Sequence, residues 1–221
     1  MKLACSALIK FTVGLLLVGA LLFLPAGSFS FLNGWLFLGL LFIPMFLLGV
    51  ILLFKAPDLL RKRLGTKEEE KTQKGVVALS GLLFIAGFVV AGLDFRFGWS
   101  KMPLWVVSVA SVVLLVSYAL YAEVMRENAY LSRTIEVQEN QKVVDTGLYG
   151  IVRHPMYAVT LWLFLAIPLV LGSWWSLLCF APYVVVIVVR IHNEEKVLEA
   201  GLKGYTEYKK RVKYRILPFV W

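Results

Sequence analysis

Residues 154–189 read HPMYAVTLWLFLAIPLVLGSWWSLLCFAPYVVVIVV and contain no Asp, Glu, Lys or Arg. A helix needs about 20 apolar residues to cross the hydrocarbon core of a bilayer, so this stretch has nearly the length of two crossings. Gly172 and Ser173 interrupt it near its middle. The stretch therefore predicts an apolar helical hairpin, with helices at 156–171 and 174–192.

Three more stretches lack these charged residues, at 11–54, 75–93 and 102–122. The first is long enough for two helices and is broken by Pro25 and the small residues after it. We expect further helices at 7–24, 31–54, 76–93 and 103–124, with Pro44 and Pro182 as points where a helix kinks. The expected fold class is all-α: a polytopic integral membrane protein of about six transmembrane helices.

The composition agrees with this fold class. Of the 221 residues, 60% are hydrophobic and 17% are charged, and the mean hydropathy is +0.79. Soluble domains usually carry about 45–50% apolar and about 25% charged residues. The composition therefore excludes a water-soluble globular enzyme.

The 23 Lys and Arg residues are distributed unevenly among the expected loops. All but Arg96 and Lys101 fall in the N-terminal segment or in the loops 55–75, 125–155 and 190–221. Cytoplasmic loops of membrane proteins carry such an excess of positive charge, so we expect six spans with both termini in the cytoplasm. The net charge of +9 is then explained by loops that face anionic headgroups, which makes membrane lipids, and not nucleic acid, the expected partners.

The first helix has an alternative interpretation as a secretory signal peptide, because Lys2 and Lys10 precede an apolar core. Its removal would break the charge pattern of six spans, so we expect the helix to be retained. A chain this compact suits the inner membrane of a bacterium or an archaeon.

Polar side chains gather at the two ends of the apolar hairpin. One cluster, at 147–157, precedes the first helix, and the other, at 190–195, follows the second. About 16 residues lead away and about 17 return, roughly 25 Å in each direction, so Arg190 returns to the depth of Tyr157. The sequence thus predicts one polar site on the cytoplasmic side of the hairpin.

Each cluster has a chemical interpretation and a simpler one. Pro155 suits the first turn of a helix, which places Arg153 and His154 at a helix N-terminus that favours an anion. Arg190 and Glu194 are four residues apart and share a helix face, as an ion pair requires. The arginines could instead anchor to lipid headgroups, and the glutamates could form a solvated helix end. His154 and His192 are far apart with no cysteine nearby, so we assign no metal site.

At these clusters the sequence resembles the isoprenylcysteine carboxyl methyltransferase-like family of integral membrane methyltransferases, and the related phospholipid N-methyltransferases. The resemblance covers residues 118–221, whereas residues 1–117 match mainly in hydropathy. We therefore divide the chain into N-terminal transmembrane helices, 1–117, and a methyltransferase signature region, 118–221. The matching positions are Gly147, Leu148, Tyr149, Arg153, His154, Pro155, Met156, Tyr157, Arg190, Glu194, Glu195, Leu198, Gly204, Tyr205, Tyr208 and the closing segment 214–221.

The resemblance implies that S-adenosylmethionine binds from the cytoplasm, in a pocket between the hairpin and the connector before it. The implied cofactor-binding residues are Gln141, Lys142, Val143, Val144, Tyr149, His154, Pro155, Met156, Tyr157, Glu194 and Glu195. Arg153 and Arg190 would bind the substrate, and Arg190 and Glu194 would be catalytic. Glu195 lies one residue closer to Gly204 than in the eukaryotic enzymes, which leaves open whether Glu194 or Glu195 holds the cofactor, and we favour Glu194.

The implied activity is methyl transfer to a lipophilic or lipidated acceptor, with isoprenylcysteine-type O-methylation of a carboxylate expected first. Phospholipid N-methylation is the alternative, and the residues do not choose between an O, N or S acceptor. An NADPH-dependent membrane reductase of the sterol type is an alternative of another class, because the basic run 209–211 could hold a 2′-phosphate. A transporter is less favoured, since the apolar spans lack ionisable groups near the midplane.

Overall fold

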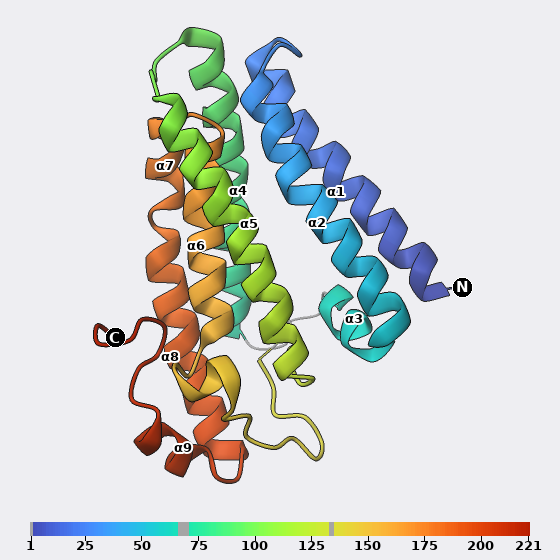
Figure 1. Ribbon diagram of the computed structural model, residues 1–221, viewed down its shortest axis with the longest axis vertical. Coiled ribbons are helices and arrows are strands. Elements are labelled where there is room, and N and C mark those ends of the chain that lie inside the picture. Colours follow the sequence, from blue (N-terminus) through green and yellow to red (C-terminus); the bar gives the residue numbers. More distant parts are fainter. Residues whose placement is uncertain (1, 66–70, 133–134) are drawn as a thin grey trace.

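The computed structural model describes residues 2–65, 71–132 and 135–221, and this part of the chain is helical and contains no strand (Figure 1). The all-α prediction is therefore confirmed. In chain order the elements are α1 (Lys2–Ala26), α2 (Leu32–Lys55), α3 (Pro57–Leu64), α4 (Lys71–Phe97), α5 (Leu104–Glu127), a 3₁₀ turn η1 (Gly147–Gly150), α6 (Pro155–Val170), α7 (Trp174–Phe180), α8 (Tyr183–Gly201) and α9 (Tyr205–Arg211).

Five helical segments of the described chain have the length and apolar composition of a membrane span. They are α1, α2, the part of α4 from residue 75 onwards, α5, and α7 together with α8. The remaining apolar helix, α6, has 16 residues, which correspond to about 24 Å. Each of the six expected apolar helices is therefore present. The last one is interrupted at Ala181 and Pro182, whereas α2 runs through Pro44.

The helices form two groups. Figure 1 shows α1 and α2 as an antiparallel pair that meets the bundle of α4, α5, α6, α7 and α8 near the α1–α2 turn and diverges from it toward α3, at the end of α2. The interior contains large apolar side chains from many helices, among them Leu22, Phe37, Leu114, Ile167 and Phe180, which are at most 1% exposed. Many large apolar side chains, in contrast, lie on the outer surface. An apolar exterior is what a lipid environment requires.

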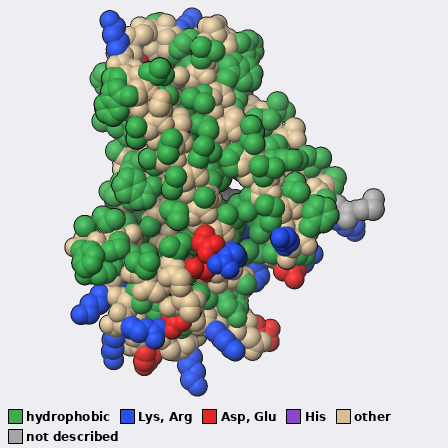
Figure 2. Space-filling model, viewed as in Figure 1, with side chains coloured by type: hydrophobic (Ala, Val, Ile, Leu, Met, Phe, Trp, Pro, Cys, Tyr) green, Lys and Arg blue, Asp and Glu red, His purple; other side chains and the backbone are tan. Residues whose placement is uncertain are grey.

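Charged side chains lie mainly at one end of the molecule. Figure 2 shows Lys and Arg gathered at the end that carries α3 and α9, with hydrophobic side chains along the middle. The start of α1 belongs to this same end, because Lys10 Nζ donates to the carbonyl of Leu64 at the end of α3, 2.6 Å away. The loops expected to be basic therefore lie together. That this end faces the cytoplasm stays a prediction.

Candidate functional site

The two arms of the predicted hairpin meet through Tyr157. Arg190 Nε on α8 donates a hydrogen bond to the Tyr157 hydroxyl, 2.9 Å away, and this hydroxyl donates to the carboxylate of Glu194. The guanidinium of Arg190 also lies over the Tyr157 ring. Arg190 thus returns to the depth of Tyr157, as the helix lengths predict. The expected link between Arg190 and Glu194 runs through the phenol of Tyr157.

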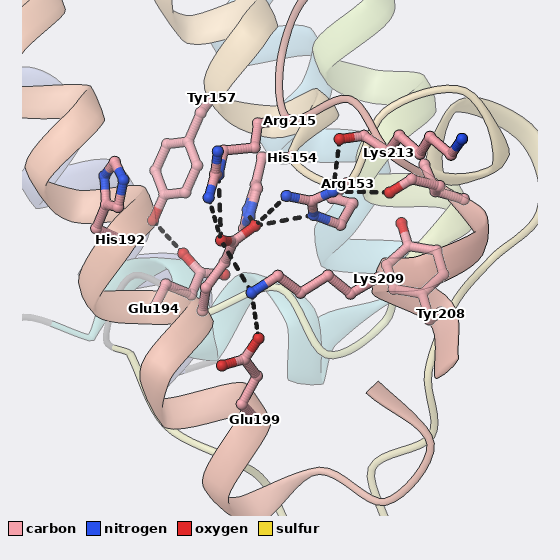
Figure 3. A network of polar contacts seen from close by, with 12 residues as sticks. Arg153, His154, Tyr157, His192, Glu194, Glu199, Tyr208, Lys209, Lys213 and Arg215 are labelled. Carbon is pink, nitrogen blue, oxygen red and sulfur yellow. Dashed lines mark hydrogen bonds and ion pairs between the residues drawn. The ribbon is translucent and has the colours of Figure 1, made fainter. Parts of the chain in front are cut away.

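Glu195, the neighbour of Glu194, lies in a buried ion network. Its Oε1 accepts from Arg153 Nε at 2.8 Å and lies 3.2 Å from His154 Nε2, while its Oε2 accepts from Arg215 Nε at 3.1 Å. Figure 3 shows Arg153, His154 and Arg215 converging on this point. The side chains of Arg153 and Glu195 are 3% and 5% exposed. The carboxylate of Glu195 therefore ties α8 to the start of α6 and to the C-terminal segment.

Backbone hydrogen bonds strengthen the attachment of the C-terminal segment. The N–H groups of Arg153 and His154 donate to the carbonyls of Tyr214 and Arg215, at 2.9 and 2.8 Å. Arg153 Nη1 donates to the carbonyls of Val212 and Lys213 as well. The sequence predicted that this helix start would favour an anion. The Glu195 carboxylate lies at the side chains of Arg153 and His154, whereas the backbone N–H groups of these two residues donate to carbonyls of the C-terminal segment.

A cavity of about 790 Å³ lies beside this network. Ligand pockets usually have volumes of about 300–1,000 Å³, so it has the size of a binding site. All the residues singled out from the sequence as site residues line it except Pro155 and Glu195. Those that line it are Gln141, Lys142, Val143, Val144, Tyr149, Arg153, His154, Met156, Tyr157, Arg190 and Glu194.

The cavity is polar at one end and apolar at the other. The polar end is lined by the connector between α5 and α6, by the start of α6 and by the second half of α8. The apolar end lies among helices of membrane-spanning length and is lined by Leu41, Met45, Leu48, Val76, Val77, Phe84, Leu163 and Phe164. Such a cavity can hold a polar ligand and an apolar chain side by side.

The connector is fixed at Tyr149, whose side chain is buried. Asn128 Nδ2 donates to the Tyr149 hydroxyl at 3.0 Å, and the Tyr208 hydroxyl donates to the Tyr149 carbonyl at 2.7 Å. Burial raises the pKa of both phenols above the ordinary value, so both stay neutral even in alkaline solution where an exposed tyrosine ionises. The motif tyrosines of the connector and of α9 therefore hold the polar end of the cavity together.

Gly147 is required by the same connector. Its φ of +54° lies in the left-handed region, and a Cβ at this position would overlap the carboxylate of Glu127. That carboxylate accepts a hydrogen bond from the backbone N–H of Leu148, 2.9 Å away. Only glycine combines this backbone conformation with the close approach of Glu127.

We expect Gly147→Ala to destabilise the protein, by about 1–2 kcal/mol from the backbone conformation alone. Displacement of the Glu127 carboxylate adds to this loss. Thermal unfolding in detergent would measure it, and Gly49→Ala is the matched control, because a Cβ there meets open space inside α2. Equal melting temperatures for the two variants would contradict the conclusion that position 147 requires glycine.

Several cavity residues were not predicted from the sequence. Arg63 on α3, Tyr118 and Tyr121 on α5, and Tyr183 on α8 line the cavity outside the motif positions. Arg63 lies in a loop whose charges are explained by the positive-inside rule, so nothing in the local sequence indicated that it would line the cavity. The two α5 tyrosines, three residues apart on one helix face, are the signal that sequence reasoning could have used.

The fold and the site define a class of protein: a polytopic α-helical membrane protein whose cavity joins a polar end to an apolar end. Residues 104–203 match the sequence profile of the family described as Phospholipid methyltransferase. This region runs from the start of α5 to just beyond α8 and contains both polar clusters. The family resemblance indicated by the motifs is therefore confirmed over these residues.

Two curated relatives are similar to part of the chain. An uncharacterized protein of Bacillus subtilis (strain 168), YpbQ, is 31% identical over 96 residues, which are 43% of this chain and 57% of that protein. The Delta(14)-sterol reductase of Mus musculus is 32% identical over 99 residues, which are 40% of this chain and 22% of the reductase. The chain thus spans less than two thirds of either relative.

Proposed function

We propose that this protein is a membrane methyltransferase that transfers a methyl group from S-adenosylmethionine to a lipophilic acceptor. One observation carries the proposal: a single cavity joins the family's motif residues to an apolar space among membrane-length helices. A polar cofactor and a lipophilic acceptor need such adjoining environments. The family match over residues 104–203 supports the same activity.

The residues of the polar end fit a cationic, polar cofactor. The carboxylate of Glu194 lines the cavity and suits the ammonium group or the ribose of S-adenosylmethionine. The hydroxyl of Tyr205 is buried and has no hydrogen-bond partner within the described part of the chain, and Tyr205 lines the cavity too. A polar ligand would satisfy that hydroxyl, whose burial without a partner is costly.

Glu194 and Glu195 differ in what they contact. The oxygens of Glu195 accept from Arg153 and Arg215 and lie beside His154, and Glu195 does not line the cavity. Glu194 contacts Tyr157 and does line the cavity. We therefore assign the cofactor role to Glu194 and a structural role to Glu195. Arg153, whose guanidinium donates to Glu195 and to two carbonyls, is likewise assigned to the fold.

The bound cofactor supplies a methyl group that is already activated by its sulfonium. A carboxylate acceptor then needs no general base, and the protein contributes by aligning the two reactants, an effect worth up to about 7–11 kcal/mol. Arg190 on the cavity wall would orient the carboxylate by a charge-assisted hydrogen bond. A phospholipid amine would need a base instead, and Glu194, whose carboxylate lines the cavity, would accept its proton. We favour the carboxylate acceptor, because Arg190 lines the cavity and can bind a carboxylate.

The sterol reductase relative supports a second candidate, a membrane reductase that uses NADPH. Two residues of the basic run that could bind the 2′-phosphate form ion pairs within the protein: Lys209 pairs with Glu199, and Arg211 pairs with Asp145. None of the residues 209–211 lines the cavity. The geometry therefore favours the methyltransferase.

Calorimetric titration of the detergent-purified protein with S-adenosylmethionine, and separately with NADPH, tests the proposal. We expect S-adenosylmethionine to bind with micromolar affinity and NADPH to give no binding heat. Binding of NADPH alone would overturn the proposal in favour of the reductase. Binding of neither would overturn both and leave a scaffold that retains the motif.

A further inference from the structure

Residues 214–221, which follow α9, form a closed loop that we call the C-terminal loop. The carbonyl of Trp221 accepts hydrogen bonds from the backbone N–H groups of Arg215 and Ile216, at 2.8 and 3.1 Å. The N–H of Trp221 in turn donates to the carbonyl of Leu217, 3.1 Å away. The residues between these bonds, 217–220, therefore form the tip of the loop.

The tip is apolar, and its side chains point out of the molecule. Leu217, Phe219 and Val220 are 41%, 88% and 72% exposed. Single exposed apolar residues are common on proteins, but a group of them on one short segment usually marks a surface that contacts a partner or a membrane. The tip is therefore a candidate interaction surface.

The backbone of Phe219 makes this exposure more significant. Its φ of +66° lies in the left-handed region, where glycine and asparagine are favoured and a large side chain is strained. The Phe219 ring lies beside that of Tyr214, with 5.3 Å between the ring centres, yet it stays exposed. A loop that only had to turn here would be more stable with asparagine. The strained position indicates that the apolar side chain has a contact outside the chain.

Two contacts fix the depth of the C-terminal loop. His154, the residue before the apolar helix α6, donates its N–H to the carbonyl of Arg215. The Trp221 ring lies 5.7 Å from the ring of His192 on α8, just beyond the apolar residues 183–189. Both neighbours mark the level at which apolar helices begin, and Figure 1 shows the loop beside α8 at the edge of the molecule. Tryptophan at this level is typical of a membrane–water interface.

The charges near the tip match an anionic surface. Lys210 and Lys213 are exposed, and neither forms an ion pair with a carboxylate of the described chain, whereas Lys209 and Arg211 do. Figure 2 shows hydrophobic side chains that protrude at this edge, above the level of most Lys and Arg side chains. Basic residues beside an apolar group are what anionic lipid headgroups attract. A soluble partner would not require the tip to lie at the level of the membrane boundary.

We propose that the C-terminal loop is a membrane-interface anchor: Phe219 and Val220 enter the bilayer at the headgroup level, and Lys210 and Lys213 bind anionic headgroups. The partner is the leaflet at the end that carries α3 and α9. Arg215 of the same loop donates to Glu195, so the bilayer and the ion network hold one segment from two sides. The inference is independent of methyl transfer.

Fluorescence quenching in nanodiscs tests whether the tip enters the bilayer. The native thiols are removed by Cys5→Ala and Cys179→Ala, and a bimane label is attached to Phe219→Cys. The matched controls are Glu207→Cys on the exposed side of α9 and Val112→Cys on the outer face of α5, where 60% of the side chain is exposed. We expect lipids with a nitroxide on the acyl chain to quench the label at 219 to an extent comparable with 112. The label at 207 should keep its fluorescence.

Quenching at 219 no greater than at 207 would overturn the proposal. A label at 219 that is shielded from water but not quenched by these lipids would overturn it too, in favour of a protein partner or a second copy of this chain. Exchange of phosphatidylglycerol for phosphatidylcholine in the nanodiscs should reduce the quenching at 219, and Lys213→Gln should remove this dependence in part. Quenching independent of phosphatidylglycerol would overturn the role given to the lysines.

Trypsin cleavage after Lys213 gives a second test without a label. Phe219→Asn suits the left-handed backbone but removes the apolar side chain, whereas Phe219→Leu keeps an apolar side chain there. In nanodiscs we expect Phe219→Asn to be cleaved several-fold faster than the wild type, and Phe219→Leu nearly as slowly as the wild type. The reverse order would show that the loop is held only by its own backbone, and would overturn the anchor.

Discussion

Glu195→Ala is expected to lower the free energy of unfolding by about 3–5 kcal/mol, the usual cost of removing one partner from a buried ion pair. The substitution leaves the guanidinium of Arg153 buried, at 3% exposure, without its anion. It also removes the partner of Arg215 and of His154. The C-terminal segment would then lose its attachment to α6 and α8. Thermal and denaturant unfolding in detergent would measure the loss.

Glu199→Ala is the matched control for this prediction. Glu199 lies one helical turn further along α8 and pairs with Lys209, but the two side chains are 38% and 35% exposed. Exposed ion pairs contribute about 0–1 kcal/mol, so the control should unfold nearly as the wild type. Similar stability of the two variants would show that the network does not hold the C-terminal segment. Limited proteolysis should also cleave that segment faster in Glu195→Ala.

The membrane helices were predictable because each corresponds to a long run of apolar residues that ends at helix-breaking residues. Pro155 begins α6, and Gly172 and Ser173 end the first arm of the hairpin, as expected. The lengths of the two arms were enough to place Arg190 beside Tyr157. The helix α3, in contrast, is short and lies in a charged loop. Its position against the cavity follows from contacts with residues about 60–75 positions away, such as Tyr121 and Gln138, and sequence spacing does not encode them.

The roles of the charged motif residues were harder to predict than their positions. Glu194 and Glu195 are adjacent, so a helix points their side chains about 100° apart, and only the packing of α8 decides which one faces the cavity. The resemblance implied that Arg153 binds the substrate. Arg153 lines the cavity, and its guanidinium donates to Glu195, 42 residues later, and to the carbonyls of Val212 and Lys213. Long-range pairing of this kind leaves no local trace in the sequence.

Glu194→Gln is expected to weaken the binding of S-adenosylmethionine by about 10- to 100-fold, with little change in the melting temperature. The carboxylate lines the cavity and is proposed to contact a charged or polar group of the cofactor, and hydrogen bonds to charged groups are worth about 1.5–3 kcal/mol. The amide keeps the shape of the side chain and a hydrogen-bond acceptor for Tyr157. The loss would therefore report on charge and not on packing.

Titrations of two further variants with S-adenosylmethionine test the roles assigned to Glu194 and Glu195. Tyr157→Phe removes the hydroxyl that joins Arg190 to Glu194 and should reduce cofactor affinity less than Glu194→Gln, because the carboxylate charge is retained. Glu195→Gln should lower stability while the folded fraction binds the cofactor with nearly normal affinity, since Glu195 does not line the cavity. If Glu195→Gln abolished binding in folded protein and Glu194→Gln did not, the roles of the two glutamates would be exchanged. The description of the fold would not change with that result, because the contacts of Glu195 are all with residues of the protein.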